Sequence, residues 1–160
     1  NDDARRYYEE GIRMSFDEHS ASDVDSYLAR TSEQGYVPAK YEDPVNSGHS
    51  KDALGSIPIA WKTSADFDEN LEQIITQKYI ALYPVGQEAW TEFRRTGYPR
   101  VFPVVVNESN GGCVDTDIQI RRLPYPESEY NTNQVELNKG ITLLGGVDNP
   151  GVKLWWDAKK

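Results

Sequence analysis

The chain has 160 residues and a formal charge of −9, from 17 lysines and arginines against 26 aspartates and glutamates. This acidic balance repels phosphate backbones, and the short basic groups Arg94-Arg95 and Arg121-Arg122 do not offset it, so nucleic-acid binding is disfavoured. No stretch approaches the roughly 20 consecutive apolar residues that cross a bilayer, and an aromatic content of 11% argues against a disordered chain.

An amphipathic helix is predicted for residues 4–17, because Ala4, Tyr8, Ile12 and Phe16 recur every four positions and form one apolar stripe. The opening residues lack the apolar run of a secretory signal peptide and read as the middle of a helix. We therefore expect the chain to begin inside a longer protein. On that expectation Tyr8 and Ile12 are left exposed, and the piece self-associates or stays bound to the rest of the protein.

Residues 31–65 are predicted to form a long irregular loop, because they are rich in glycine, proline, serine and aspartate and show no sustained period. Irregular segments of this length are often binding loops. Three aromatic side chains in this loop are our predicted ligand-binding residues: Tyr36, Tyr41 and Trp61. Aromatic rings offer a large contact area that suits the apolar faces of sugars. The alternative role for these rings, and the commoner one, is to anchor the loop on the core.

Two further helices are predicted at 66–83 and 87–96. The first keeps helical spacing of its apolar residues and begins with a plausible capping box formed by Asp66 and Glu69. The second ends where Gly97 fits the position after the helix. The short gap between them predicts a helical hairpin or corner.

The remainder of the chain predicts one hairpin and one helix. Residues 101–106 and 118–123 are rich in β-branched side chains and flank an Asn-Gly-Gly turn at 110–112, so they are predicted to pair, with Pro103 keeping the first strand at an edge. A last helix is predicted at 134–144. The predicted fold class is mainly α, with long irregular loops and a small β-hairpin.

The sequence gives little support for a metal site or for a catalytic nucleophile. His19 and His49 lie far apart in polar surroundings, and neither has a second ligand at helical spacing, so no metal site is predicted. Cys113 has no adjacent lysine, arginine or histidine that would lower the pKa of its thiol. We predict no catalytic residue, no metal and no cofactor.

Carboxylate pairs leave an enzymatic alternative open. Glu9 with Glu10, and Glu127 with Glu129, resemble the acidic pairs of glycoside hydrolases. That chemistry depends on the distance between the two carboxylates, which a sequence does not give. Solvated surface positions are the favoured interpretation.

The arginine pair Arg94-Arg95 is predicted to be structural. Both residues stand at the end of a predicted helix, where cations are favoured by the helix dipole. Either side chain has Glu88 or Glu92 within reach as an ion-pair partner. This role is favoured over the capture of an anionic ligand.

The segment IITQKYIALYPVGQEAWTEFRRTGYPRVFPV resembles the signature stretch of the SusD/RagB family of outer-membrane nutrient-binding lipoproteins. Further stretches occur in the family's usual order, and together with the signature they are 7–19, 74–104, 121–133, 143–149 and 153–157. The four stretches from residue 74 onward occur in order, and this makes a chance match improbable. The long loop is the weakest part of the resemblance.

The resemblance implies a fold and a function. Members are mostly helical, bind a glycan or in some branches a peptide at the extracellular face of the outer membrane, and deliver it to a SusC-like TonB-dependent transporter. They are not enzymes. The chain, residues 1–160, would be the C-terminal segment of such a protein, whose lipid anchor would lie in an N-terminal part. The matched motifs carry over no ligand-binding residue, and the rival readings are a glycoside hydrolase or a structural fragment without activity of its own.

Overall fold

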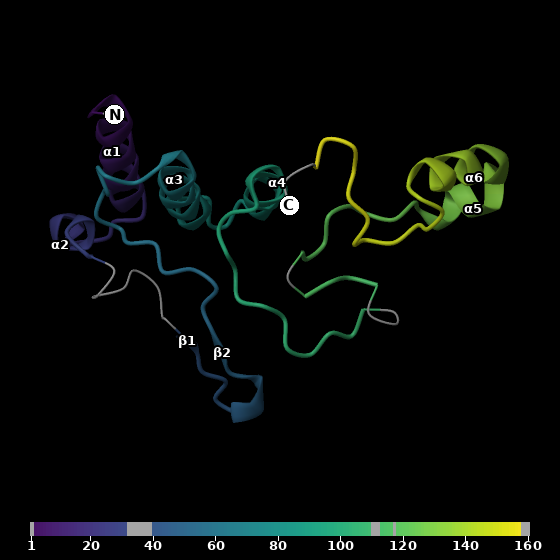
Figure 1. The fold of residues 1–160 in the computed structure, drawn as a ribbon, viewed down its shortest axis with the longest axis horizontal. Helices are drawn as coiled ribbons and strands as arrows, with labels where there is room; N and C mark the ends of the chain where they lie inside the picture. The colour runs from purple at the N-terminus through teal and green to yellow at the C-terminus, as the bar shows by residue number, and fades with distance from the viewer. Residues whose placement is uncertain (1, 32–39, 110–112, 117, 158–160) are drawn as a thin grey trace. The chain divides into compact units, whose positions relative to one another are not determined.

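The computed structural model describes residues 2–31, 40–109, 113–116 and 118–157 (Figure 1). The chain divides into two compact units, Asn1–Phe102 and Pro103–Lys160. The first unit contains four α-helices and a short antiparallel strand pair within its described residues: α1 (Asp2–Glu18), α2 (Val24–Leu28), β1 (Lys40–Tyr41), β2 (Lys51–Asp52), α3 (Phe67–Ala81) and α4 (Gly86–Thr96). The second contains α5 (Glu127–Thr132) and α6 (Gln134–Leu143). The prediction of a mainly α-helical fold is confirmed.

Helix α1 buries the apolar stripe predicted from the sequence. Tyr8 and Ile12 are buried and form a small core with Ile59, which is 0% exposed. The Tyr8 hydroxyl donates a hydrogen bond of 2.6 Å to the carbonyl oxygen of Ile59. The expectation that Tyr8 and Ile12 are exposed is therefore wrong, because a segment 51 residues further along the chain covers them.

The two central helices begin and end as their sequences predict. The Asp66 side chain accepts a hydrogen bond from the Glu69 N–H, and the Glu69 side chain accepts one from the Asp66 N–H, which completes the capping box. Gly97 has a φ of 76° and donates its N–H to the carbonyl oxygen of Phe93, as expected for the residue that ends α4. The two helices pack against each other.

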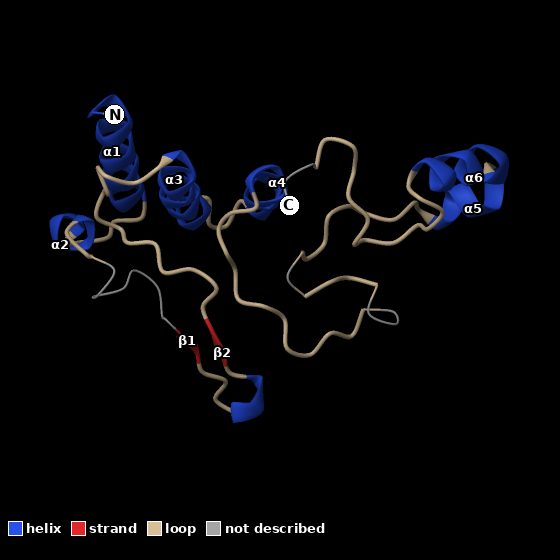
Figure 2. Ribbon diagram, viewed as in Figure 1, coloured by secondary structure: helices blue, strands red, loops and turns tan. Residues whose placement is uncertain are grey.

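The strand pair lies inside the predicted loop 31–65. Lys40 pairs with Asp52 and Tyr41 pairs with Lys51 in an antiparallel register. A single 3₁₀ turn, Ser47–His49, lies between the two strands (Figure 2).

The predicted hairpin of 101–106 with 118–123 is wrong. Both segments are irregular in the structure. Gln119 has a φ of 64°, which is left-handed backbone and interrupts an extended run. Pro103 lacks an N–H for a strand ladder, so neither segment offers an unbroken edge. The turn at 110–112 lies outside the described residues.

The second unit contains the last predicted helix. The prediction of 134–144 agrees with α6, which ends before Gly145 and Gly146 at φ values of 92° and 93°. Among the described residues of this unit, Leu137 is the only apolar side chain that is buried. Polar contacts therefore carry much of its cohesion.

Candidate functional site

The aromatic residues predicted to bind ligand do not converge on one described site. Tyr36 lies outside the described residues. Tyr41 is on β1 and is 46% exposed. Trp61 is half-buried beside the core of α1. Their roles in ligand binding stay predictions.

Trp61 is held against α1 by neighbouring contacts. Its ring lies 5.2 Å from the ring of Tyr8, centroid to centroid, at an angle of 50°. The flanking backbone is bonded to α3 through Gln73, whose amide nitrogen donates to the carbonyl oxygens of Pro58 at 2.8 Å and Ala60 at 3.0 Å. The anchoring role that the sequence left open therefore has direct support, and the part of Trp61 that remains exposed has a fixed position.

Tyr41 stands at the base of a loop that is closed by its own hydrogen bonds. Its ring lies 6.2 Å from the ring of Phe102, at 54°. The Asp43 carboxylate accepts N–H bonds from Val45 and Asn46 at 2.8 and 2.7 Å. These two backbone bonds, that from Asn46 first, lower the pKa of Asp43 below its usual value. The loop therefore keeps an ionised carboxylate and a half-exposed aromatic ring two residues apart.

The carboxylate pairs do not have the geometry of a glycosidase. Glu9 and Glu10 are adjacent on α1, and Glu127 and Glu129 are two residues apart on α5. Side chains at these spacings on a helix do not face each other, whereas glycoside hydrolysis needs two carboxylates across one bond. Glu9 also accepts a hydrogen bond from Arg5 at 2.7 Å. The hydrolase alternative gains no support from these residues.

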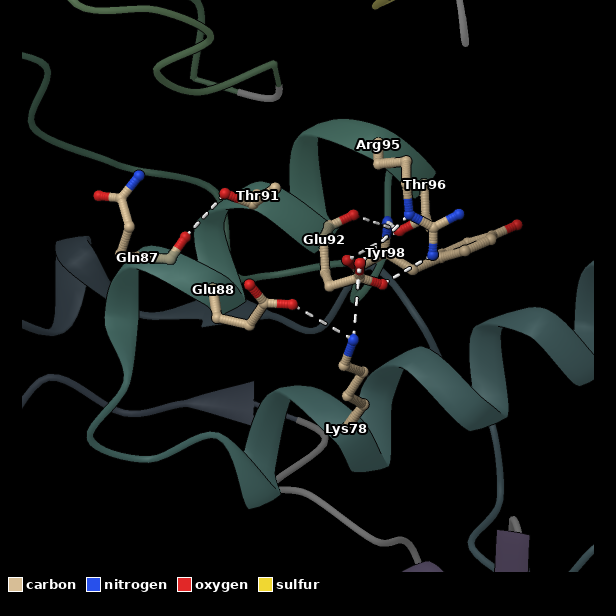
Figure 3. Close-up of polar contacts among 8 residues, drawn as sticks. All are labelled: Lys78, Gln87, Glu88, Thr91, Glu92, Arg95, Thr96 and Tyr98. Atoms are coloured by element: carbon tan, nitrogen blue, oxygen red, sulfur yellow. Dashed lines mark hydrogen bonds and ion pairs between the residues drawn. The ribbon is translucent and has the colours of Figure 1, made fainter. Parts of the chain in front are cut away.

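A polar network joins α3 to α4 at Glu92 (Figure 3). Arg95 donates two hydrogen bonds to the Glu92 carboxylate, at 2.7 and 3.2 Å. The Lys78 ammonium on α3 lies 3.5 Å from both Glu88 and Glu92 on α4. The hydrogen bond from Arg95 is the largest cause that holds the pKa of Glu92 below its usual value. The prediction that the arginine pair bridges an acid of the same helix is confirmed for Arg95.

Arg94, the other member of the pair, lies over an aromatic ring. Its guanidinium carbon is 3.6 Å from the centroid of the Trp90 ring. Such a cation–π contact is stabilising because the negative face of the aromatic ring attracts the guanidinium charge. Both arginines therefore take part in packing within α4.

The second unit carries polar contacts that sequence patterns did not reveal. Asp148 accepts hydrogen bonds from the Arg122 guanidinium, from the Tyr130 hydroxyl at 2.8 Å and from the Tyr125 N–H at 3.0 Å. Burial by itself raises the pKa of Asp148, but these three bonds together lower it below the usual value. Arg121 and Arg122 both donate their backbone N–H to the carbonyl oxygen of Pro150. The only sequence signal was the basic doublet, and it did not indicate the acidic partners.

The described residues offer neither a metal-binding cluster nor a membrane-spanning helix. They contain no cluster of three or more histidine, cysteine, aspartate or glutamate side chains placed to hold a metal ion. No helix in the described part is long and apolar enough to span a membrane.

Comparisons with known proteins define the class of this chain. Residues 1–157 match the family model SusD-like, described as Susd and RagB outer membrane lipoprotein. A search of curated proteins gave no match. The helical fold is that of solved SusD homologues. The chain belongs to the SusD-like family.

Solved relatives share about two fifths of the sequence. A chitin-binding SusD homologue from Flavobacterium johnsoniae is 39% identical, with a TM-score of 0.83 over 98% of this chain and 32% of its own. A SusD homologue from Bacteroides uniformis is 41% identical, with a TM-score of 0.83 over 97% of this chain and 32% of its own. A SusD-like protein from Bacteroides thetaiotaomicron is 37% identical, with a TM-score of 0.83 and coverage of 98% and 32%. The chain spans about a third of the length of these relatives.

Proposed function

We propose that this chain forms part of a non-catalytic, glycan-binding protein at the extracellular face of the outer membrane. The observation that carries the proposal is the 39% identity, over 98% of this chain, to a SusD homologue described as chitin-binding. The family description as an outer membrane lipoprotein supports the location. The lipid anchor and delivery of the ligand to a SusC-like TonB-dependent transporter are further parts of the proposal.

Oligomers of N-acetylglucosamine, the repeating sugar of chitin, are the first ligand to test. One solved relative is described as chitin-binding. A sugar ring presents an apolar face that packs on an aromatic side chain, with polar groups at the rim. Tyr41 fits this role best among the described candidates, because its ring is half-exposed and Asp43 offers an acceptor beside it. Trp61 contributes through the part of its ring that Tyr8 does not cover.

The proposal is tested by calorimetric titration with chitin oligosaccharides. The titrated protein has the length that the cell produces. Binding without release of shorter sugars supports it. Tyr41→Ala is expected to weaken binding about tenfold, since stacking on one aromatic ring is worth ~1–3 kcal/mol in the comparable case of nucleobases. Tyr79→Ala, which removes a partly exposed tyrosine of α3, is the matched control and leaves binding unchanged.

Three outcomes would contradict parts of the proposal. Hydrolysis of the oligosaccharide would replace the binding function with the glycoside hydrolase alternative. Binding of a peptide mixture with no binding of any glycan would overturn the ligand class. Unchanged affinity in Tyr41→Ala and Trp61→Ala would remove both residues from the site while leaving family membership intact.

A further inference from the structure

The turn between β1 and β2 carries a cluster of polar side chains beside Tyr41. The Asp43 carboxylate lies at its centre, and this side chain is 18% exposed. Its Oδ1 atom accepts the N–H groups of Val45 and Asn46, whereas its Oδ2 atom lies 3.7 Å from Nδ1 of His49. The two oxygens therefore serve different partners, because one closes the turn and the other faces the histidine.

The Tyr41 ring is tied to the same carboxylate through its hydroxyl. The backbone bonds from Asn46 and Val45 are the largest causes that lower the pKa of Asp43, and a hydrogen bond from the Tyr41 hydroxyl lowers it further. Phe102 packs on the ring at 6.2 Å, and neither strand contacts a helix in the described part of the chain. Phe102 supplies an apolar contact and Asp43 a polar one, so the orientation of the ring depends on both.

The contacts of His49 show which of its ring nitrogens carries the proton. The Asn46 amide oxygen accepts the Gly48 N–H at 3.0 Å, so the amide nitrogen is the atom that faces Nε2 of His49, also at 3.0 Å. The amide nitrogen donates, and Nε2 must therefore accept. The proton of neutral His49 is then on Nδ1, the atom that faces Asp43.

Protonation of His49 disrupts this arrangement. An added proton on Nε2 would point at the amide hydrogens of Asn46, and two donors do not bond each other. The positive ring is instead attracted to the Asp43 carboxylate, where it competes with the Tyr41 hydroxyl. Protonation therefore weakens the polar contact that holds Tyr41.

Other charged side chains also belong to the hairpin, residues 40–52, or to the segment that packs on it: Lys40, Glu42, Lys51, Asp52 and Arg100. Lys40 pairs with Glu42 at 3.8 Å, and Arg100 pairs with Glu72 of α3 at 3.3 Å. Histidine is the only one of these residue types whose charge ordinarily changes between pH 5 and 8. A pH effect on Tyr41 over this range is therefore traced to His49.

We propose that Asp43 orients the Tyr41 ring for the glycan and that protonation of His49 releases the ring, so that binding weakens as the pH falls. The inference rests on the proposed glycan contact of Tyr41 and adds two positioning residues to that site. An exposed ring that is already held in one orientation loses less conformational freedom when a ligand binds. A ring released from Asp43 must be ordered by the ligand itself, and this lowers the affinity.

Calorimetric titration with chitin oligosaccharides at pH 8 and at pH 5 tests the inference in the protein at the length that its cell produces. The affinity is expected to fall roughly threefold at the lower pH, as for the loss of one modest hydrogen bond. His49→Gln keeps an acceptor for Asn46 but takes up no proton, so it removes the fall. His19→Gln changes the other histidine of the 160 residues, which bonds the Ser15 carbonyl oxygen, and this matched control keeps the fall.

A second variant removes the hydroxyl and keeps the ring. Tyr41→Phe is expected to bind at pH 8 about as weakly as the parent does at pH 5, with no further fall at the lower pH. Equal affinity of the parent at both pH values would overturn the inference. A fall that persists undiminished in His49→Gln would overturn it too.

A measurement without ligand separates this inference from the proposed function. In protein labelled with ¹³C-tyrosine, the Tyr41 ring resonances are identified by their absence in Tyr41→Ala. They are expected to shift between pH 8 and pH 5 in the parent and to stay in place in His49→Gln. Resonances that do not shift in the parent would overturn the inference and leave the proposed function standing. Resonances that shift while the glycan affinity ignores both pH and Tyr41→Ala would support the link to His49 and contradict the glycan contact of Tyr41.

Discussion

Arg121 and Asp157 form a buried ion pair that joins two segments 36 residues apart. The arginine Nε and Nη2 atoms donate to the two carboxylate oxygens, each at 2.6 Å, and the side chains are 5% and 1% exposed. Arg122 pairs with Asp148 next to it. In the described part of this unit, Leu137 is the only buried apolar residue. The paired charges therefore substitute for a larger apolar core.

Breaking the Arg121–Asp157 pair from one side should strongly destabilise the protein. Arg121→Met leaves the Asp157 carboxylate buried without its bidentate partner. Removing one member of a buried pair typically costs about 3–5 kcal/mol of unfolding free energy. Urea titration followed by circular dichroism measures this change.

Two controls distinguish the buried pair from ion pairing in general. The double variant Arg121→Met with Asp157→Leu should recover part of the loss, because no unpaired charge remains. Arg5→Ala breaks an exposed pair with Glu9 and should cost less than about 1 kcal/mol. Equal losses for Arg121→Met and Arg5→Ala would contradict the structural role of the pair.

The pKa of Asp148 predicts how stability depends on pH. Its pKa in the folded protein lies below the ordinary value of 3.8, so the unfolded chain binds the proton more tightly than the folded one. The stabilisation is therefore complete above the unfolded pKa and is lost as the pH falls through the folded pKa. The urea midpoint should stay level near neutral pH and fall below about pH 4.

Asp148→Asn removes the titrating group while keeping an oxygen that accepts a hydrogen bond. We expect this variant to be less stable than the parent at pH 7, because Arg122 loses its charged partner. The difference between parent and variant should shrink as the pH is lowered from 5 toward 3. A difference that stays constant over this range would show that Asp148 does not contribute through its charge.

The elements that the sequence predicts well are those whose signals are local. The capping box of Asp66 and Glu69 lies within four residues, and the apolar spacing of 66–83 continues over several turns. The predicted helix therefore agrees with α3 to within two residues at each end. Gly97 ends α4 for the same kind of reason, since one residue type suits one backbone conformation.

The missed features depend on contacts between distant residues. β1 and β2 have two residues each, too few for a strand period to be visible. The segment around Ile59 is fixed by the Tyr8 hydroxyl, 51 residues away, and no pattern in residues 31–65 signals that bond. Of the three aromatic site predictions, the structure describes Tyr41, whose ring contacts Phe102, and Trp61, whose ring contacts Tyr8. Their shared feature was composition, which carries no information on spatial convergence.

Gly97 should tolerate asparagine better than alanine. Its φ of 76° is costly for most side chains, at roughly 1–2 kcal/mol, whereas asparagine adopts this conformation more readily. Gly97→Ala is expected to lower the unfolding free energy by about 1 kcal/mol, and Gly97→Asn by less. Thermal unfolding of both variants checks the order, and the reverse order would contradict the left-handed conformation.

Gln73 should control the position of the Trp61 segment. It is 1% exposed, its amide nitrogen donates to Pro58 and Ala60, and its amide oxygen accepts from the Lys62 N–H at 3.4 Å. Gln73→Met keeps the size of the side chain but leaves these backbone groups without their partner. The expected cost is about 1–3 kcal/mol of unfolding free energy.

Hydrogen exchange separates a local effect of Gln73→Met from a global one. The amides of residues 59–62 should exchange faster in the variant by a larger factor than the amides of α6, because their anchor on α3 is lost. Gln87→Met, at an exposed position of α4, is the matched control and should change neither rate. If Trp61 contacts the glycan, the variant also weakens binding while Tyr41 remains in place. Uniformly faster exchange across the first unit would show that Gln73 stabilises the unit as a whole and does not specifically position Trp61.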